Sequence, residues 1–220
     1  MPAARASARN VGAPPIDAVE NRSSCSGRSS SALSPVVVDA ATGLKLDLYI
    51  PEGVVNAPVV VFIHGGYWRA LCKEDSVFMA QNFTSLGVAV AALDYSLAPA
   101  AHLSLMVDQC RRAAAWLHRQ GGALGVDTRR MVVAGSSAGA HLAAMVLASG
   151  WQATHGVPDD VARGGVLVSG LYDLQPLRYS YLQPMIQLDD GIVKRNSPAF
   201  LMRKSSTNKR RKKWVPITRS

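Results

Sequence analysis

Short apolar runs alternate with helix-length segments through the middle of this 220-residue chain. The runs 59–63, 88–93 and 166–169 have the length and apolar character of strands in a sheet that is covered by other elements. Segments 73–86 and 103–119 have the length and the apolar spacing of helices. Regular alternation of strand and helix predicts a mostly parallel sheet with helices on both faces. In such sheets, ligand sites lie at the carboxyl ends of the strands.

The flanking segments divide the chain into one domain and two tails. Residues 1–34 are rich in Ala, Ser, Arg and Pro, and they predict a disordered tail. Residues 35–202 form the α/β domain, and 203–220 form a basic, irregular tail. Within the domain we also expect strands at 36–38, 44–50 and 131–134 and a helix at 138–149.

The net charge of +9 is concentrated near the ends of the chain. Eight of the 24 Lys and Arg residues lie in 196–220, whereas residues 36–195 are almost neutral. The domain surface therefore gives no reason to expect nucleic acid as a partner. No apolar run approaches the roughly 18 residues that a membrane helix needs, and no secretory signal is evident. We expect a cytoplasmic protein with a small-molecule partner, and homodimerisation stays open.

A serine between glycines follows one of the predicted strands. Residues 135–139 are GSSAG and come directly after the apolar run 131–134. A sharp turn from strand to helix pushes the central serine, Ser137, into an exposed position suited to attack on a carbonyl. The glycines at both ends leave room for the chain to fold back on itself. Ser136 is the rival nucleophile, but it sits one residue too early in the turn.

A second glycine motif follows another predicted strand. Gly65 and Gly66 come after 59–63, and without Cβ atoms their amides can closely approach a substrate oxygen. The amide of Ala138 lies at the start of the helix, where N–H groups have no intrahelical partner. These three amides could form an oxyanion hole. Although about 70 residues separate the motifs, both lie at strand carboxyl ends, so they can meet.

The acid and base that serine attack requires are harder to find. In this arrangement the chain order is serine, then acid, then histidine. No histidine follows His155, and no acidic residue follows Asp190. His141 belongs to the helix beneath the turn, and His155 precedes the next strand, so neither is expected to be the base. We expect poor activity, because without a base the serine stays protonated.

The other candidate side chains have supporting roles. His64 precedes the two glycines and is interpreted as a residue that orients the loop. Asp173 either lines the pocket, replaces the usual acid or faces solvent in a turn. His102 and His118 are expected at the surface. No histidines or carboxylates are spaced like a metal site, and we expect no cofactor.

Four motifs resemble the α/β-hydrolase superfamily, in particular its kynurenine formamidase (arylformamidase) and esterase/lipase-like branch. They are 63–68 (IHGGYW), 94–99 (DYSLAP), 135–142 (GSSAGAHL) and 169–174 (SGLYDL). The resemblance covers roughly residues 36–200, and the Tyr67-Trp68 ending favours the formamidase group. It implies hydrolysis of a formamide such as N-formylkynurenine, or of an ester, with Ser137 as nucleophile and Gly65, Gly66 and Ala138 as oxyanion donors.

The sequence departs from this family after residue 201. The next strand should carry the acid and a later one the histidine loop, but a basic, low-complexity run follows instead. We therefore expect the last strands of the sheet to be missing. A frameshifted end and a natural tail both remain open. The leading hypothesis is an impaired serine hydrolase acting through an acyl-enzyme. The alternatives are a non-catalytic binding protein of the same fold and a nucleic-acid binder that uses the basic tail.

Overall fold

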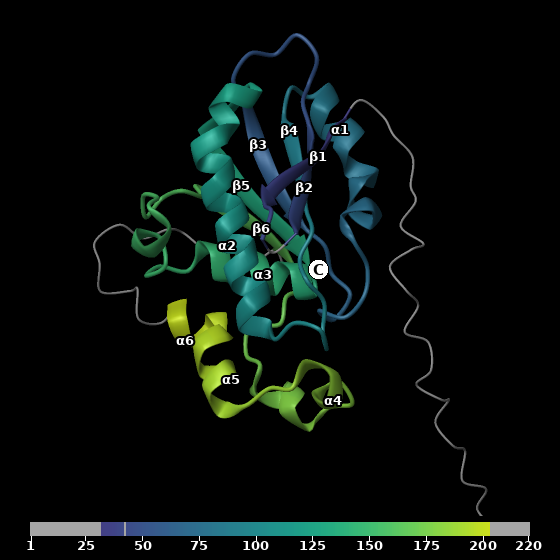
Figure 1. Ribbon diagram of the computed structural model, residues 1–220, viewed down its shortest axis with the longest axis vertical. Coiled ribbons are helices and arrows are strands. Elements are labelled where there is room, and N and C mark those ends of the chain that lie inside the picture. Colours follow the sequence, from purple (N-terminus) through teal and green to yellow (C-terminus); the bar gives the residue numbers. More distant parts are fainter. Residues whose placement is uncertain (1–31, 42, 203–220) are drawn as a thin grey trace, which may run out of the picture.

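The computed structural model describes residues 32–41 and 43–202, and within them six strands form one mixed sheet (Figure 1). The strand order is β1-β2-β4-β3-β5-β6. The β1–β2 and β2–β4 pairs are antiparallel, whereas β3–β4, β3–β5 and β5–β6 are parallel. The bounds are β1 (Ala32–Asp39), β2 (Leu44–Tyr49), β3 (Ala57–Ile63), β4 (Ala89–Leu93), β5 (Val126–Ser136) and β6 (Gly164–Val168). The mostly parallel sheet predicted from the alternation is confirmed.

Helices cover this sheet and gather beyond one of its ends. The α-helices are α1 (Ala80–Ser85), α2 (Leu103–Gln120), α3 (Ala138–Leu147), α4 (Gln183–Ile186), α5 (Asp190–Asn196) and α6 (Pro198–Met202). The 3-10 helices are η2 (Lys73–Met79), η3 (Gly121–Leu124), η4 (Ala153–His155) and η5 (Gln175–Tyr179). α3 packs along β5 and β6 and against α2, whereas η2 and α1 pack on β4. β4 is buried along its whole length, so both of its faces are covered.

Two segments differ from what the sequence predicts. The single helix expected at 73–86 is a 3-10 helix, η2, followed by a short α-helix, α1. Ser76, Val77 and Phe78 have modest helix propensity, which is consistent with the tighter first half. The segment after Asp189, for which no helix or strand was predicted, contains the short helices α5 and α6. The Asp189 side chain accepts a hydrogen bond from the Ile192 amide and caps α5.

The predicted tails fall mostly outside the described residues. The tail expected at 1–34 lies outside them except for its last three residues, which begin β1 instead. The basic tail at 203–220 lies wholly outside them. Among the residues that are described, no helix is both long and apolar enough to cross a membrane.

β6 forms one edge of the sheet and has one bare face. Val166 is 48% exposed and Val168 51% exposed, whereas Leu167 packs against the core. Residues 169–202 contain short helices and irregular segments and add no strand beyond β6. In Figure 1 the green to yellow helices α4, α5 and α6 lie below the sheet. An uncharged edge strand with exposed valines is a potential site of association.

Candidate active site

Ser137 occupies a strained turn between β5 and α3. Its backbone has φ +56° and ψ −119°, in the left-handed half of conformational space, which residues with a side chain rarely adopt. The Ser137 amide donates to the Val168 carbonyl of β6 at 2.8 Å. Its own carbonyl accepts from the His141 amide at 3.1 Å, inside the first turn of α3. Hydrogen bonds on both sides therefore hold the strained residue in place, and its side chain is partly exposed.

The two glycines that flank this turn are sterically required. A Cβ on Gly135 would lie 2.4 Å from the Gly139 carbonyl carbon. A Cβ on Gly139 would lie 2.0 Å from the Ile63 carbonyl oxygen at the end of β3. Real Cβ atoms do not approach backbone atoms so closely, so each position excludes any larger residue. The missing side chains let α3 start directly against β3 and β5.

The glycine loop after β3 contacts this turn. A Cβ on Gly65 would lie 3.0 Å from the Ser136 carbonyl oxygen and 3.5 Å from the Ser137 Cβ. The two glycine motifs therefore lie side by side, as their common place at strand carboxyl ends predicts. Gly66 has φ +95°, and its carbonyl accepts from the amides of Arg69 and Ala70, which closes a tight turn.

His64, which was interpreted as a residue that orients the glycine loop, is a buried side chain at the start of that loop. It is 1% exposed, and its ring stacks on Tyr95 with 4.2 Å between centroids. Its Nδ1 lies 3.0 Å from the Gly65 carbonyl, and its Nε2 lies 3.5 Å from Asp94 Oδ1. The Tyr95 hydroxyl approaches the His64 and Gly65 carbonyls. These contacts hold the loop through β4, the neighbouring strand.

The remaining motif residues have different surroundings. Tyr67 is 45% exposed with φ +50°, and Trp68 is 1% exposed with φ +59°. Asp173 is exposed, and its Oδ1 accepts from the Gln175 amide at 3.0 Å. Of the three alternatives for Asp173, this matches the solvent-facing turn aspartate.

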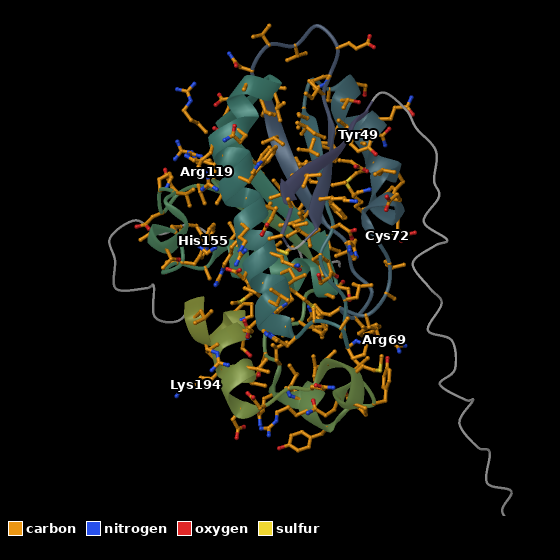
Figure 2. All side chains as sticks on the ribbon, viewed as in Figure 1. Tyr49, Arg69, Cys72, Arg119, His155 and Lys194 are labelled. Atoms are coloured by element: carbon orange, nitrogen blue, oxygen red, sulfur yellow. The ribbon has the colours of Figure 1, made fainter. Side chains whose placement is uncertain are left out.

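All five histidines lie in the described part of the chain, and none hydrogen-bonds to the Ser137 hydroxyl. His141 is fully buried and its Nε2 lies 2.7 Å from the Asn196 carbonyl. Burial lowers the pKa of His141 to about 4. His155 pairs with Asp108 and lies beside Arg119, far across the molecule from Arg69 of the glycine loop (Figure 2).

The other two histidines belong to α2 and its N-terminal cap and not to the Ser137 turn. His102 is exposed and caps α2, where its Nδ1 accepts from the Leu105 amide at 3.2 Å. His118 was expected at the surface, but it is half-buried near the end of α2. The described residues also contain no group of three or more potential metal ligands.

One supporting residue escaped the sequence analysis. Gln109 lies on the buried face of α2 and is 2% exposed. Its side-chain oxygen accepts from the Ser96 amide, and its nitrogen donates to the Ser96 hydroxyl, both at 2.9 Å. It thereby fixes the loop that follows Tyr95. The available signal was a lone polar residue on an otherwise apolar helix face.

Together these groups form the candidate active site. The Ser137 side chain is partly exposed at the N-terminal end of α3, where the helix dipole favours developing negative charge. The Ala138 amide is one of the first N–H groups of this helix, and Gly65 lies against the turn. A serine oxygen beside backbone amides suits attack on a carbonyl carbon.

Comparisons with known proteins place the chain in a family. The BD-FAE family matches residues 46–160. Kynurenine formamidase of Salmo salar is 38% identical over 161 residues, which span 73% of this chain and 53% of that protein. The chain thus spans about half the length of this curated relative.

Two solved structures also share the fold. The crystal structure of a putative thioesterase from Silicibacter sp. tm1040 is similar to this chain, with a TM-score of 0.65 and 31% sequence identity. The similarity covers 77% of this chain and 62% of the thioesterase chain. The carboxylesterase EstE1, from a metagenomic library, has a TM-score of 0.57 and 28% sequence identity to this chain. The similarity covers 63% of this chain and 47% of the EstE1 chain. The α/β-hydrolase fold expected from the four motifs is confirmed, and the chain belongs to the BD-FAE family.

Proposed function

We propose that this chain carries the nucleophile and oxyanion half of a serine hydrolase that acts on esters or aryl formamides. The observation that carries the proposal is the contact of the strained Ser137 turn with the Gly65 loop. Such strain persists only where the surrounding structure enforces it, and it is concentrated at functional sites. The kynurenine formamidase and esterase relatives support this reaction class and make N-formylkynurenine the first substrate to test.

The chemistry follows from the proposed roles. The Ser137 oxygen forms a bond to the substrate carbonyl carbon and loses its proton, and the carbonyl oxygen becomes an oxyanion. The amides of Gly65, Gly66 and Ala138 donate to that oxyanion, and each such donor lowers a barrier by about 3–4 kcal/mol. Collapse of the tetrahedral intermediate expels an alcohol or amine and leaves an acyl-enzyme. Water then cleaves the Ser137 ester.

The described residues supply no evident group for the proton transfers that this reaction needs. A base must accept the serine proton and later protonate the leaving group. No histidine in the described residues lies in hydrogen-bonding contact with Ser137, so we propose slow acylation, by several powers of ten relative to a complete triad. The same observation favours a second candidate, a binding protein that retains the pocket without turnover.

Labelling with a fluorophosphonate tests the nucleophile. This probe reacts with activated serines, and mass spectrometry locates the modified residue. The proposal expects slow labelling of Ser137 in the full chain and none in Ser137→Ala. Labelling at Ser136 instead would contradict the assignment.

Turnover assays separate the two candidate functions. Release of p-nitrophenol from a p-nitrophenyl ester, or of formate from N-formylkynurenine, should be weak and absent in Ser137→Ala. Complete lack of labelling and turnover would favour the binding protein. Brisk turnover that depends on Ser137 would refute the proposed slow acylation.

A further inference from the structure

Two of the buried nitrogen atoms that lack a hydrogen-bond partner among the described residues belong to rings that contact each other beside the site. They are Nε1 of Trp68 and Nδ1 of His141. Neither side chain is more than 1% exposed. The rings meet edge to face, with 5.2 Å between centroids and an interplanar angle of 87°. Buried polar atoms are rarely left unpaired, because each one loses its contacts with water.

The two atoms are chemically complementary. The indole Nε1 of Trp68 can only donate. The Nε2 of His141 lies 2.7 Å from the Asn196 carbonyl oxygen, which can only accept, so Nε2 carries a hydrogen. Because burial lowers the pKa of His141 to about 4, the ring is neutral near pH 7. The Nδ1 of His141 therefore carries no hydrogen and can accept a hydrogen bond. The neighbouring Trp68 ring has a donor, Nε1–H, without an acceptor among the described residues.

We propose that one buried water bridges Trp68 Nε1–H and His141 Nδ1, and that this bridging hydrogen bond holds the glycine loop against the nucleophile helix. Trp68 lies two residues after Gly66 in the loop. His141 lies one helical turn after Ser137 and is bonded to its carbonyl. The bond therefore joins the two halves of the site through side chains that do not touch substrate.

The arrangement continues into two further helices. The Asn196 side chain, at the end of α5, donates to the Ser104 hydroxyl and to the Ile192 carbonyl, both at 2.9 Å. His141 is thus a positioning residue connecting the glycine loop, α3 and α5. The hydrogen bond itself does not depend on the proposed function, whereas its effect on Ser137 reactivity does.

Nuclear magnetic resonance of the ¹⁵N-labelled full chain tests the bond directly. Trp68→Phe keeps an aromatic ring, removes the donor and identifies the Trp68 indole signal. Trp151 provides an internal reference, because its Nε1 donates to the Val146 carbonyl at 3.0 Å. The Trp68 indole proton should exchange with solvent as slowly as that of Trp151. Trp68→Phe should shift the His141 Nδ1 resonance, and an unchanged resonance would overturn the proposal.

A pair of His141 variants separates the two hydrogen bonds of the ring. In His141→Gln the amide reaches the Nε2 position, which keeps the Asn196 contact and removes the acceptor for Trp68. In His141→Asn the amide reaches the Nδ1 position. This variant keeps the acceptor for Trp68 and loses the hydrogen bond to the Asn196 carbonyl. Amide exchange in loop 65–71 should accelerate about fivefold to tenfold in His141→Gln, as expected for loss of one hydrogen bond. Exchange in His141→Asn should stay near the wild-type rate, and equal rates in both variants would contradict the proposal.

The rate of Ser137 labelling adds a functional readout. Trp68→Phe and His141→Gln should each slow it about fivefold to tenfold, and the double variant should be no slower than either single one. Trp151→Phe removes a buried indole donor elsewhere and should leave the rate unchanged. If the double variant instead lost the product of the two single reductions in labelling rate, Trp68 and His141 would act independently and the proposed water-bridged hydrogen bond between them would be refuted. An inert Ser137 in the wild-type chain would refute the proposed function instead, while the resonance and exchange data would still decide the bond.

Discussion

The Tyr95 hydroxyl lies 3.1 Å from the His64 carbonyl oxygen and 3.0 Å from the Gly65 carbonyl oxygen. Tyr95 is 2% exposed, and burial raises the pKa of its hydroxyl well above the usual range, so the group remains a donor. A residue that follows β4 thus holds the start of the loop that follows β3. The loop's position depends on the neighbouring strand and not only on its own glycines.

Replacing Tyr95 by phenylalanine should loosen this loop. The change keeps the ring stacked on His64 but removes the hydroxyl donor shared by the buried His64 carbonyl and the partly buried Gly65 carbonyl. We expect a loss of about 1–3 kcal/mol in the free energy of unfolding, measured by urea denaturation, and slower labelling of Ser137. Tyr181→Phe, at a site that is 74% exposed, is the control and should change neither quantity. Equal stability of the two variants would show that the Tyr95 hydroxyl does not fix the loop.

Gly139 should tolerate no side chain. In Gly139→Ala the new Cβ would lie 2.0 Å from the Ile63 carbonyl oxygen, so α3 must move away from β3. We expect destabilisation of at least about 3 kcal/mol, or failure to fold. Gly122→Ala is the matched control, since its Cβ meets nothing within 4 Å. The two urea midpoints should differ clearly, and similar midpoints would argue against close packing at the turn.

Ser137 should cost the chain stability because of its backbone conformation. Ser137→Ala and Ser137→Gly both remove the hydroxyl, but only glycine adopts φ +56° without strain. Relief of about 1–3 kcal/mol of strain outweighs the roughly 0.5–1 kcal/mol that glycine flexibility costs. The glycine variant should therefore unfold at higher urea than the alanine variant, while neither is labelled by a fluorophosphonate. The opposite order would indicate that the turn is not strained.

The sequence predicts the parts of this fold that depend on local pattern. The apolar run of β3 and the glycines around Ser137 have clear signals, because strand burial and turn geometry restrict the residue types at those positions. The short helices α4 to α6 have four to seven residues, too few for a periodic pattern to identify them.

Contacts between distant segments carry no such local signal. Trp68 and His141 both lie in recognisable motifs, yet nothing in either motif indicates that their rings meet. The Asn196 carbonyl that orients His141 belongs to a helix 55 residues further along the chain. Only the folded arrangement brings these three residues together, so the sequence predicts the turn at Ser137 and its glycines but not the side chains that surround them.

The neutral, buried His141 should make stability depend on pH in a defined window. Its pKa is about 4 in the folded chain, against about 6.5 for an ordinary histidine, so below pH 6.5 the unfolded chain binds a proton that the folded chain excludes. His141 does not lower the free energy of unfolding above about pH 6.5. Its destabilising effect grows as the pH falls below about 6.5 and reaches its full size below about pH 4. We expect a loss of about 2 kcal/mol between pH 7.5 and pH 5 from this group.

His141→Gln isolates this contribution, because glutamine does not titrate and all other ionisable groups are unchanged. Urea unfolding of both proteins at pH 7.5 and pH 5 gives the pH-dependent loss for each. The wild-type loss should exceed that of the variant by about 2 kcal/mol, since only the wild-type unfolded chain gains the histidine proton. Equal losses would mean that the pKa of His141 is not lowered by folding, so that at pH 5 the folded ring is protonated and its Nδ1 cannot accept a hydrogen bond.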